Sequence, residues 1–135
     1  LGRFLAGPEL AAALEQPWAA RAAWRSPGWL YHLALGPEWQ AARTDGVYRR
    51  STRGRSLEEV GFIHLSNTHQ VEATAALFYG DLPAGAVLLL TIDPQRLAAA
   101  GLEVRLEQVG GGEPFPHLYG PLPLGAVLRA EPWLR

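Results

Sequence analysis

Three of the four histidines stand inside short apolar segments that predict β-strands, an uncommon place for this residue. His32 lies in WLYHLA, His64 in GFIHLS and His117 in FPHLYG. Imidazole changes charge near neutral pH, so it serves as a general acid or base, and it also binds phosphate, hydroxyl groups or metal ions. If the three strands are neighbours, the rings converge on one cleft, and these three histidines are the candidate catalytic residues. His69 falls in the first turn of a predicted helix and is expected to face solvent.

Three residue types are missing, which removes several kinds of chemistry. The 135-residue sequence has no Cys and no Met, and its twelve arginines account for the whole Lys+Arg total, so Lys is missing too. This excludes disulfides, thiolate nucleophiles and Cys-ligated zinc or iron–sulfur sites. It also excludes a lysine Schiff base, and a P-loop would lack its phosphate-binding lysine. A nucleophile or base must therefore come from Ser, Thr, Tyr, His, Asp, Glu or a bound water.

The histidines admit three functional hypotheses. In the first, a metal-free set binds a phosphate or a ribose hydroxyl and exchanges protons with it. In the second, the three rings bind zinc and leave one position open for water, as in a zinc-dependent hydrolase. In the third, each imidazole is structural, and the domain is a non-catalytic ligand-binding or interaction module. No compact H-x-x-x-H or HExxH motif supports the zinc hypothesis, so we expect no metal.

Positive charge is concentrated in the first part of the chain. Residues 1–56 hold eight arginines and four acidic residues, a net charge of +4, whereas residues 57–135 carry −5. The excess gathers in residues 49–55, and guanidinium groups bind phosphate with paired hydrogen bonds. We therefore include Arg49 among the candidate ligand contacts. The overall charge of −1 argues against bulk nucleic-acid binding, so we expect no nucleic-acid partner beyond a nucleotide end.

Apolar spacing and capping residues predict the elements that must position these side chains. Helices are predicted over 8–25, 36–45, 68–79 and 94–100. Strands are predicted over 29–34, 61–66, 86–92, 102–107, 115–119 and 126–130. The continuous apolar run at 86–92 indicates a central strand, and the alternation at 102–107 indicates a half-buried one. This order predicts a single α+β domain.

The connecting segments carry further signals. Residues 47–56 (VYRRSTRGRS) predict a basic polar loop, and Ser56 starts a capping-box pattern for one helical turn. The three glycines at 110–112 predict a flexible hairpin connection, since no helix follows them as a dinucleotide fingerprint requires. Ser66 directly follows the His64 strand, where it either donates a hydrogen bond in the cleft or caps the next helix. No apolar run approaches the roughly 20 residues of a membrane helix, so we expect a soluble, cytoplasmic protein without a membrane partner.

Three segments that each contain a strand histidine together resemble the bacterial domain-of-unknown-function family 952. They are Leu30-Tyr31-His32-Leu33, Gly61-Phe62-Ile63-His64-Leu65-Ser66 and Phe115-Pro116-His117-Leu118-Tyr119-Gly120-Pro121-Leu122. Glu107 also fits the pattern of that family. The resemblance covers residues 29–135 as one domain, and it implies that residues 1–28 are an added N-terminal helical extension.

That family is similar to the ADP-ribosyltransferase superfamily, which includes the RNA 2′-phosphotransferases. The resemblance implies a split, mostly antiparallel β-sheet with flanking helices, which would hold NAD⁺ or a related phosphorylated ribonucleotide between its halves. In such enzymes the functional residues come from the first strand, from the second strand just before a helix, and from a late strand. In this chain those places are occupied by His32, His64 and His117.

The resemblance also implies roles for these residues. His32 would contact a ribose hydroxyl, and His64 would contact the ribose or the nicotinamide side of the ligand. His117 would act as an acid, as a base or as a hydrogen-bond donor to a phosphate. The common transferases carry a Glu where this chain has His117, so the implied reaction differs from ordinary protein ADP-ribosylation. The ligand-binding candidates are Tyr31, Phe62, Ser66, Tyr119, Glu107 and Arg49.

Overall fold

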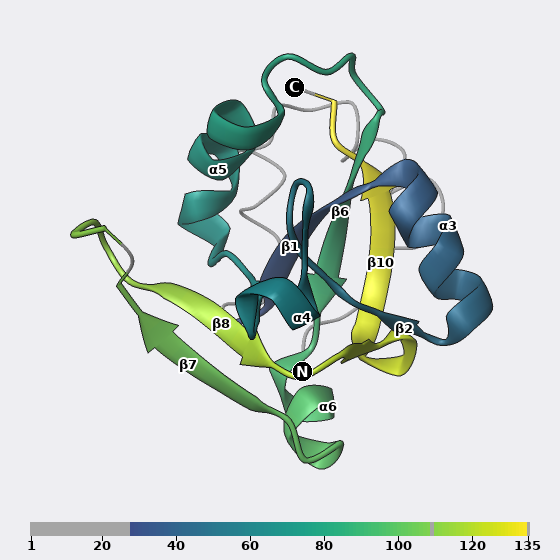
Figure 1. Cartoon of the computed structure of the whole chain (residues 1–135), viewed down its shortest axis with the longest axis vertical. Helices are drawn as coiled ribbons and strands as arrows, with labels where there is room; N and C mark the ends of the chain where they lie inside the picture. The colour runs from purple at the N-terminus through teal and green to yellow at the C-terminus, as the bar shows by residue number, and fades with distance from the viewer. Residues whose placement is uncertain (1–27, 109, 135) are drawn as a thin grey trace.

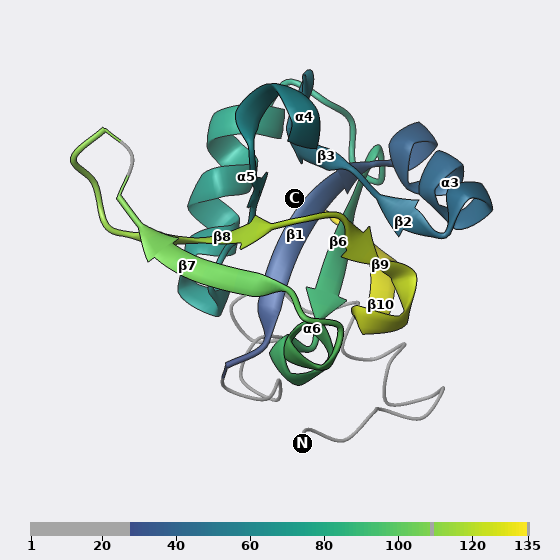
Figure 2. The same cartoon turned by 60° about the horizontal axis from the view of Figure 1, so that its bottom comes forward.

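The computed structural model describes residues 28–108 and 110–134. The predicted helix over 8–25, and with it the helical extension apart from Gly28, lies outside the described residues. The described residues form an α+β arrangement of small antiparallel sheets with helices packed around them (Figures 1 and 2). Within them, no helix is both long and apolar enough to cross a membrane.

The first sheet has the strand order β1-β6-β10, and every pairing in it is antiparallel. The strands are β1 (Leu30–Leu35), β6 (Val87–Ile92) and β10 (Val127–Pro132). β6 is the central strand, as its continuous apolar run predicts. Leu90 packs in the cluster on one face of the sheet and Leu89 in the cluster on the other, and neither side chain is exposed.

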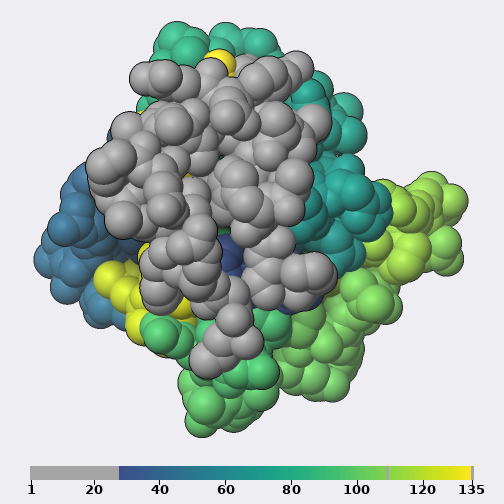
Figure 3. Space-filling view, turned by 180° about the vertical axis from the view of Figure 1, so that it is seen from behind, coloured from purple at the N-terminus to yellow at the C-terminus, as the bar shows by residue number. Residues whose placement is uncertain are grey.

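A second antiparallel sheet has the order β5-β8-β7. Its strands are β5 (Ile63–His64), β8 (Phe115–Tyr119) and β7 (Glu103–Glu107). β7 and β8 form the hairpin that the three glycines predict, and the tip of this hairpin projects from the body of the molecule (Figure 3). β7 is an edge strand, so it is more exposed than its alternating sequence predicts; Leu106 is 65% exposed.

The two sheets meet where β1 passes the segment after β5. Tyr31 and Ser66 exchange two backbone hydrogen bonds, of 2.9 and 2.8 Å, as an isolated antiparallel bridge. The Leu65 amide donates to the carbonyl of Pro116 in β8 at 2.9 Å. The predicted strand over 61–66 is therefore shorter than expected, because only two of its residues pair regularly with β8 and Ser66 pairs with β1 instead.

Helices flank the sheets on both sides (Figures 1 and 2). The α-helices are α3 (Gly36–Asp45), α4 (Leu57–Val60), α5 (Val71–Tyr79) and α6 (Pro94–Ala99), and the 3₁₀ turns are Thr68–Gln70 and Leu124–Ala126. α3 ends at Gly46, whose left-handed backbone (φ 86°) only glycine adopts readily. α4 begins with the capping box that Ser56 predicts, since Ser56 Oγ and the Glu59 carboxylate each accept the other residue's amide.

The basic segment 47–56 is not a loop, which corrects the expectation from its polar sequence. It contains β2 (Val47–Tyr48), paired with β9 (Leu122–Pro123), and the hairpin of β3 (Arg50–Thr52) and β4 (Arg55–Ser56). Tyr48 and Ser51 are buried while the arginines face outward. The sequence did not reveal these strands for two reasons. Charged residues are frequent in the segment, and each strand is too short to show a clear alternation of buried and exposed positions.

We expect Leu90→Ala to lower the free energy of unfolding by about 2–5 kcal/mol, because it leaves a cavity beside the central strand. Leu106→Ala, on the exposed edge strand, should change it by less than about 0.5 kcal/mol. Urea denaturation of the two variants and the wild type measures both values. Equal losses in the two variants would contradict the placement of β6 at the centre of the core.

Candidate functional site

An open pocket of about 640 Å³ lies between the β3–β4 hairpin, α5 and the β5–β8 pair. Aromatic rings form much of its wall, from Phe62, Phe78 and Phe115. Polar groups are placed among them: the pocket is also lined by Ser51, Thr52, Thr74, His64, His117, Arg53 and Arg55. An apolar, aromatic cavity of this size with a few converging polar groups is typical of a small-molecule site.

His117 and Ser51 are the most fully buried polar residues on this wall, each at 1% exposure. Nδ1 of His117 lies 2.8 Å from Oε1 of Glu107, and the same oxygen accepts a hydrogen bond from the Tyr119 hydroxyl at 2.5 Å. The hydrogen bonds from Tyr119 and then His117 hold the pKa of Glu107 below its usual range, so this carboxyl is ionised and accepts only. His117 therefore carries its proton on Nδ1.

The other ring nitrogen of His117, Nε2, is buried and has no hydrogen-bond partner. Because Nδ1 donates to Glu107, Nε2 of the neutral ring is an acceptor. Phe62 stacks on the imidazole with ring centroids 3.9 Å apart and planes inclined by 12°, which keeps the ring in place. A carboxylate that orients a histidine and leaves Nε2 free to take a proton is the arrangement of a general base.

His64 faces His117 across the β5–β8 pairing, with ring centroids 5.6 Å apart. It is half-buried and packs near the rings of Phe115 at 4.8 Å and Phe78 at 6.4 Å. Burial, and secondarily the neighbouring His117, lowers the pKa of His64 to about 4. His64 is therefore a neutral imidazole at pH 7 and is able to accept a proton or a hydrogen bond.

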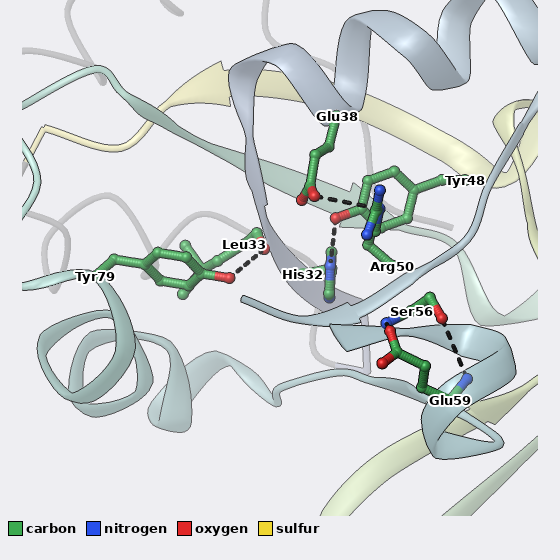
Figure 4. A network of polar contacts seen from close by, with 8 residues as sticks. All are labelled: His32, Leu33, Glu38, Tyr48, Arg50, Ser56, Glu59 and Tyr79. Atoms are coloured by element: carbon green, nitrogen blue, oxygen red, sulfur yellow. Dashed lines mark hydrogen bonds and ion pairs between the residues drawn. The ribbon is translucent and has the colours of Figure 1, made fainter. Parts of the chain in front are cut away.

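His32 is not among the residues that line the larger pocket; it borders the recess of about 20 Å³ beside it. Its Nδ1 lies 2.7 Å from the His64 carbonyl, which only accepts, so Nδ1 carries the proton and donates. Nε2 then accepts from the Tyr48 hydroxyl at 2.9 Å, as Figure 4 shows. Both nitrogens are engaged and the residue is 4% exposed, so His32 is structural in this arrangement. Burial lowers its pKa to about 4.

The ligand-binding candidates divide into four groups. Phe62 lines the pocket, while Glu107 and Tyr119 stand behind His117. Ser66 is buried and borders a recess of about 20 Å³ that shares several lining residues with the pocket. The remaining two candidates, Tyr31 and Arg49, lie elsewhere.

Tyr31 is fully buried in the core cluster against α5, because its side chain is on the face of β1 opposite to that of His32. Arg49 lies outside the pocket and is paired with Glu58 at 3.4 Å. Neither is placed to contact a ligand in the pocket. The arginines of the basic segment that do line it are Arg53 and Arg55.

Sequence reasoning missed Ser51, Phe78 and Phe115 as lining residues. Ser51 lies within the segment that was predicted to be a polar loop, and Phe78 lies within the predicted helix over 68–79. The apolar segment around Phe115 predicted a strand, but a sequence does not show which face of a strand meets a cavity.

The three-histidine zinc hypothesis does not find its donor set. Across residues 28–108 and 110–134, no three His, Cys, Asp or Glu side chains are grouped as they would be to hold one metal ion. Both ring nitrogens of His32 are engaged in hydrogen bonds, so of the three strand histidines only His64 and His117 have a nitrogen that could bind a metal ion.

We expect stability to fall as the pH decreases from 7 to 5, because His32 binds a proton in the unfolded chain near pH 6.5 but in the folded protein only near pH 4. Stability from this group is complete above pH 6.5 and is lost as the pH falls towards 4. The loss between pH 7 and 5 should be on the order of 2 kcal/mol for His32 alone. Urea denaturation at both pH values measures it in the wild type, His32→Gln and, as the exposed control, His69→Gln. The dependence should weaken only in His32→Gln; an equal slope in all three proteins would contradict it.

Comparisons with known proteins agree with the motif resemblance at the level of the family. Residues 34–130 match the family model described as "Protein of unknown function (DUF952)". The chain is 31% identical to protein CC0527 from Caulobacter crescentus in its X-ray crystal structure, with a TM-score of 0.63 over 77% of this chain and 84% of that chain. The solution NMR structure of CC0527 gives 32% identity and a TM-score of 0.59 over 76% and 81%.

No curated protein matches the chain. The family match begins after His32, but it includes His64, His117 and every residue that lines the pocket. It spans well over half of the sequence, and the solved relative shares the fold. The chain therefore belongs to the DUF952 family.

Proposed function

We propose that the protein is an enzyme that binds NAD⁺ or a related phosphorylated ribonucleotide in this pocket and uses His117 to accept and return a proton. The observation that carries the proposal is the buried Nε2 of His117, which has no partner and belongs to a residue on the pocket wall. Buried polar atoms in proteins nearly always have a partner. An unpaired one beside a pocket indicates the place of a ligand atom.

The walls of the pocket suit a nucleotide. Phe62, Phe78 and Phe115 offer aromatic surface on which a heterocyclic base can stack. Arg55 is exposed at the edge of the pocket, where its charge acts on the nearby Glu59 carboxylate without a salt bridge between the two, so its guanidinium N–H groups can bind phosphate. The volume of about 640 Å³ falls within the range of small-molecule sites.

The proposal includes an ADP-ribosyltransferase-like fold. Two antiparallel sheets that meet at the bridge between Tyr31 and Ser66, with the pocket beside β5 and β8, support that part of it. The late-strand position holds His117 rather than a carboxylate. A protonated imidazole would repel a developing positive charge on the ribose, so the geometry supports proton transfer better than carbocation stabilisation.

His117 and Glu107 would work as a pair. The neutral imidazole takes a proton at Nε2 from a bound hydroxyl group or water, and the ionised Glu107 stabilises the imidazolium that results. The deprotonated oxygen then forms a bond to the bound nucleotide as the bond to a leaving group breaks, and the same ring returns the proton to that leaving group. Tyr119 and the stacked Phe62 keep the carboxylate and the ring in position during both steps.

We expect NAD⁺, ADP-ribose or a 2′-phosphorylated nucleotide to bind the wild type below millimolar concentration, and His117→Phe to weaken that binding at least tenfold. The phenyl ring keeps the contact with Phe62 and loses only one protein hydrogen bond, so the free energy of unfolding should change by about 1 kcal/mol at most. Calorimetry and urea denaturation measure the two quantities.

His69→Gln is the matched control, because His69 is exposed and lies outside the pocket. It should leave both quantities unchanged. The enzyme proposal fails if none of the three ligands binds, or if His117→Phe destabilises the fold while binding persists. The second outcome would favour a non-catalytic module with structural histidines.

A further inference from the structure

Two side-chain atoms of the pocket wall are buried without a hydrogen-bond partner: Ser51 Oγ and His117 Nε2. Both residues are 1% exposed. The Nδ1–H of His117 donates to Glu107, so Nε2 accepts when the ring carries a single proton, and the Ser51 hydroxyl both donates and accepts. A ligand group that bonds to Nε2 of the singly protonated ring must carry an O–H or an N–H, and such a group also suits the Ser51 hydroxyl.

A recess of about 20 Å³ adjoins the pocket at Ser51. Ser51, His64 and Thr74 line both spaces, and Ser66 borders the recess. A space of this volume holds one group of the size of a water molecule or a hydroxyl. Every side chain that lines the recess is uncharged at neutral pH, since burial keeps both of its histidines neutral.

The inner end offers no positive charge to an anion. Arg53 lines the pocket, but its guanidinium donates to the Asp81 carboxylate at 2.6 Å and to the Phe78 carbonyl at 3.0 Å. The ionised Glu107 stands directly behind His117. A phosphate placed against Nε2 would meet an acceptor backed by a carboxylate, which is unfavourable for a buried anion.

The mouth has the opposite character. Arg55 belongs to the β3–β4 hairpin and is exposed; Glu59 is its electrostatic neighbour, but the two form no salt bridge. Its neighbour Gly54 turns the hairpin with a φ of 76°, which places Arg55 at the start of the returning strand. This guanidinium is the group of the pocket that suits a phosphate.

Building on the proposed function, we infer that the pocket is two-ended. Its inner end, formed by Ser51 and His117, selects an uncharged hydroxyl or amide donor, and its mouth at Arg55 holds the phosphate of the same ligand. The substrate class is thus a phosphorylated nucleoside that enters with a neutral hydroxyl or amide end first. This reverses the expectation that His117 donates to a phosphate, because its ring offers an acceptor there.

Nitrogen-15 NMR titration with two separate probes tests the two ends. Inorganic phosphate should shift the Arg55 side-chain and Gly54 amide signals and leave the His117 ring nitrogens unchanged. Ribose, a neutral polyol, should shift His117 Nε2 and leave Arg55 unchanged. Arg55→Gln should abolish the phosphate response alone, whereas Arg43→Gln, an exposed arginine on α3 outside the pocket, should keep both responses.

Calorimetry with ADP-ribose tests both ends of the pocket with one ligand, because ADP-ribose carries hydroxyl groups and phosphates. Ser51→Ala should weaken binding about fivefold, the size of one neutral hydrogen bond. Arg55→Gln should also weaken it, and should reduce its dependence on salt concentration. Arg43→Gln should bind as the wild type does.

The outcomes separate this inference from the proposed function. If NAD⁺ and ADP-ribose do not bind but phosphate and ribose act at opposite ends, the proposed function fails and the two-ended pocket stands. If phosphate shifts His117 at lower concentration than Arg55, or ribose leaves Nε2 unchanged, the two-ended pocket is wrong even where ADP-ribose binds. Unchanged ADP-ribose affinity in Ser51→Ala would also overturn it.

Discussion

The imidazole of His32 connects β1, β2 and β5 through hydrogen bonds, and the pocket depends on that connection. Its ring is carried by β1, donates to the backbone of β5 and accepts from the Tyr48 hydroxyl of β2. Beside it, Tyr31 and Ser66 exchange the backbone hydrogen bonds that join the two sheets. A neutral imidazole with one donor and one acceptor suits this place, because each nitrogen meets a group of the opposite kind.

The position of the pocket follows from this junction. β5 is held to β1 on one side and to β8 on the other, so His64 and His117 face each other across a short pairing. α5 closes one side of the space and the β3–β4 hairpin another, with Arg53 linking the hairpin to Asp81 just after the helix. The junction is buried, whereas the pocket beside it is open.

The two buried histidines differ because of what their surroundings leave unsatisfied. His32 has both nitrogens in hydrogen bonds to protein groups, while His117 has one nitrogen on Glu107 and the other without a partner. A buried histidine with both ring nitrogens in hydrogen bonds stabilises the folded state. A half-satisfied one costs stability, and folded proteins keep such groups mainly where a ligand or a reaction makes use of them.

Much of the fold was predictable from local signals. The apolar run of β6, the capping box at Ser56 and the glycine that ends α3 each act over a few residues, so their residue types suffice to predict them. The strands of the basic segment were missed because their pairing is with β9 and with each other, and the charged side chains concealed the buried Tyr48 and Ser51.

The sequence by itself determined which residues were candidates. Without Cys, Lys or Met, the strand histidines were the main groups left for polar chemistry, and their motifs indicated the family. Only the tertiary structure decided which of them meet a cavity. The burial, tautomer and hydrogen-bond partners of each histidine depend on strands that are separated in the sequence. His117 is ten residues from Glu107, and His32 is 32 residues from the carbonyl that accepts its hydrogen bond. Those contacts engage both ring nitrogens of His32 and place His117 on the wall of the pocket.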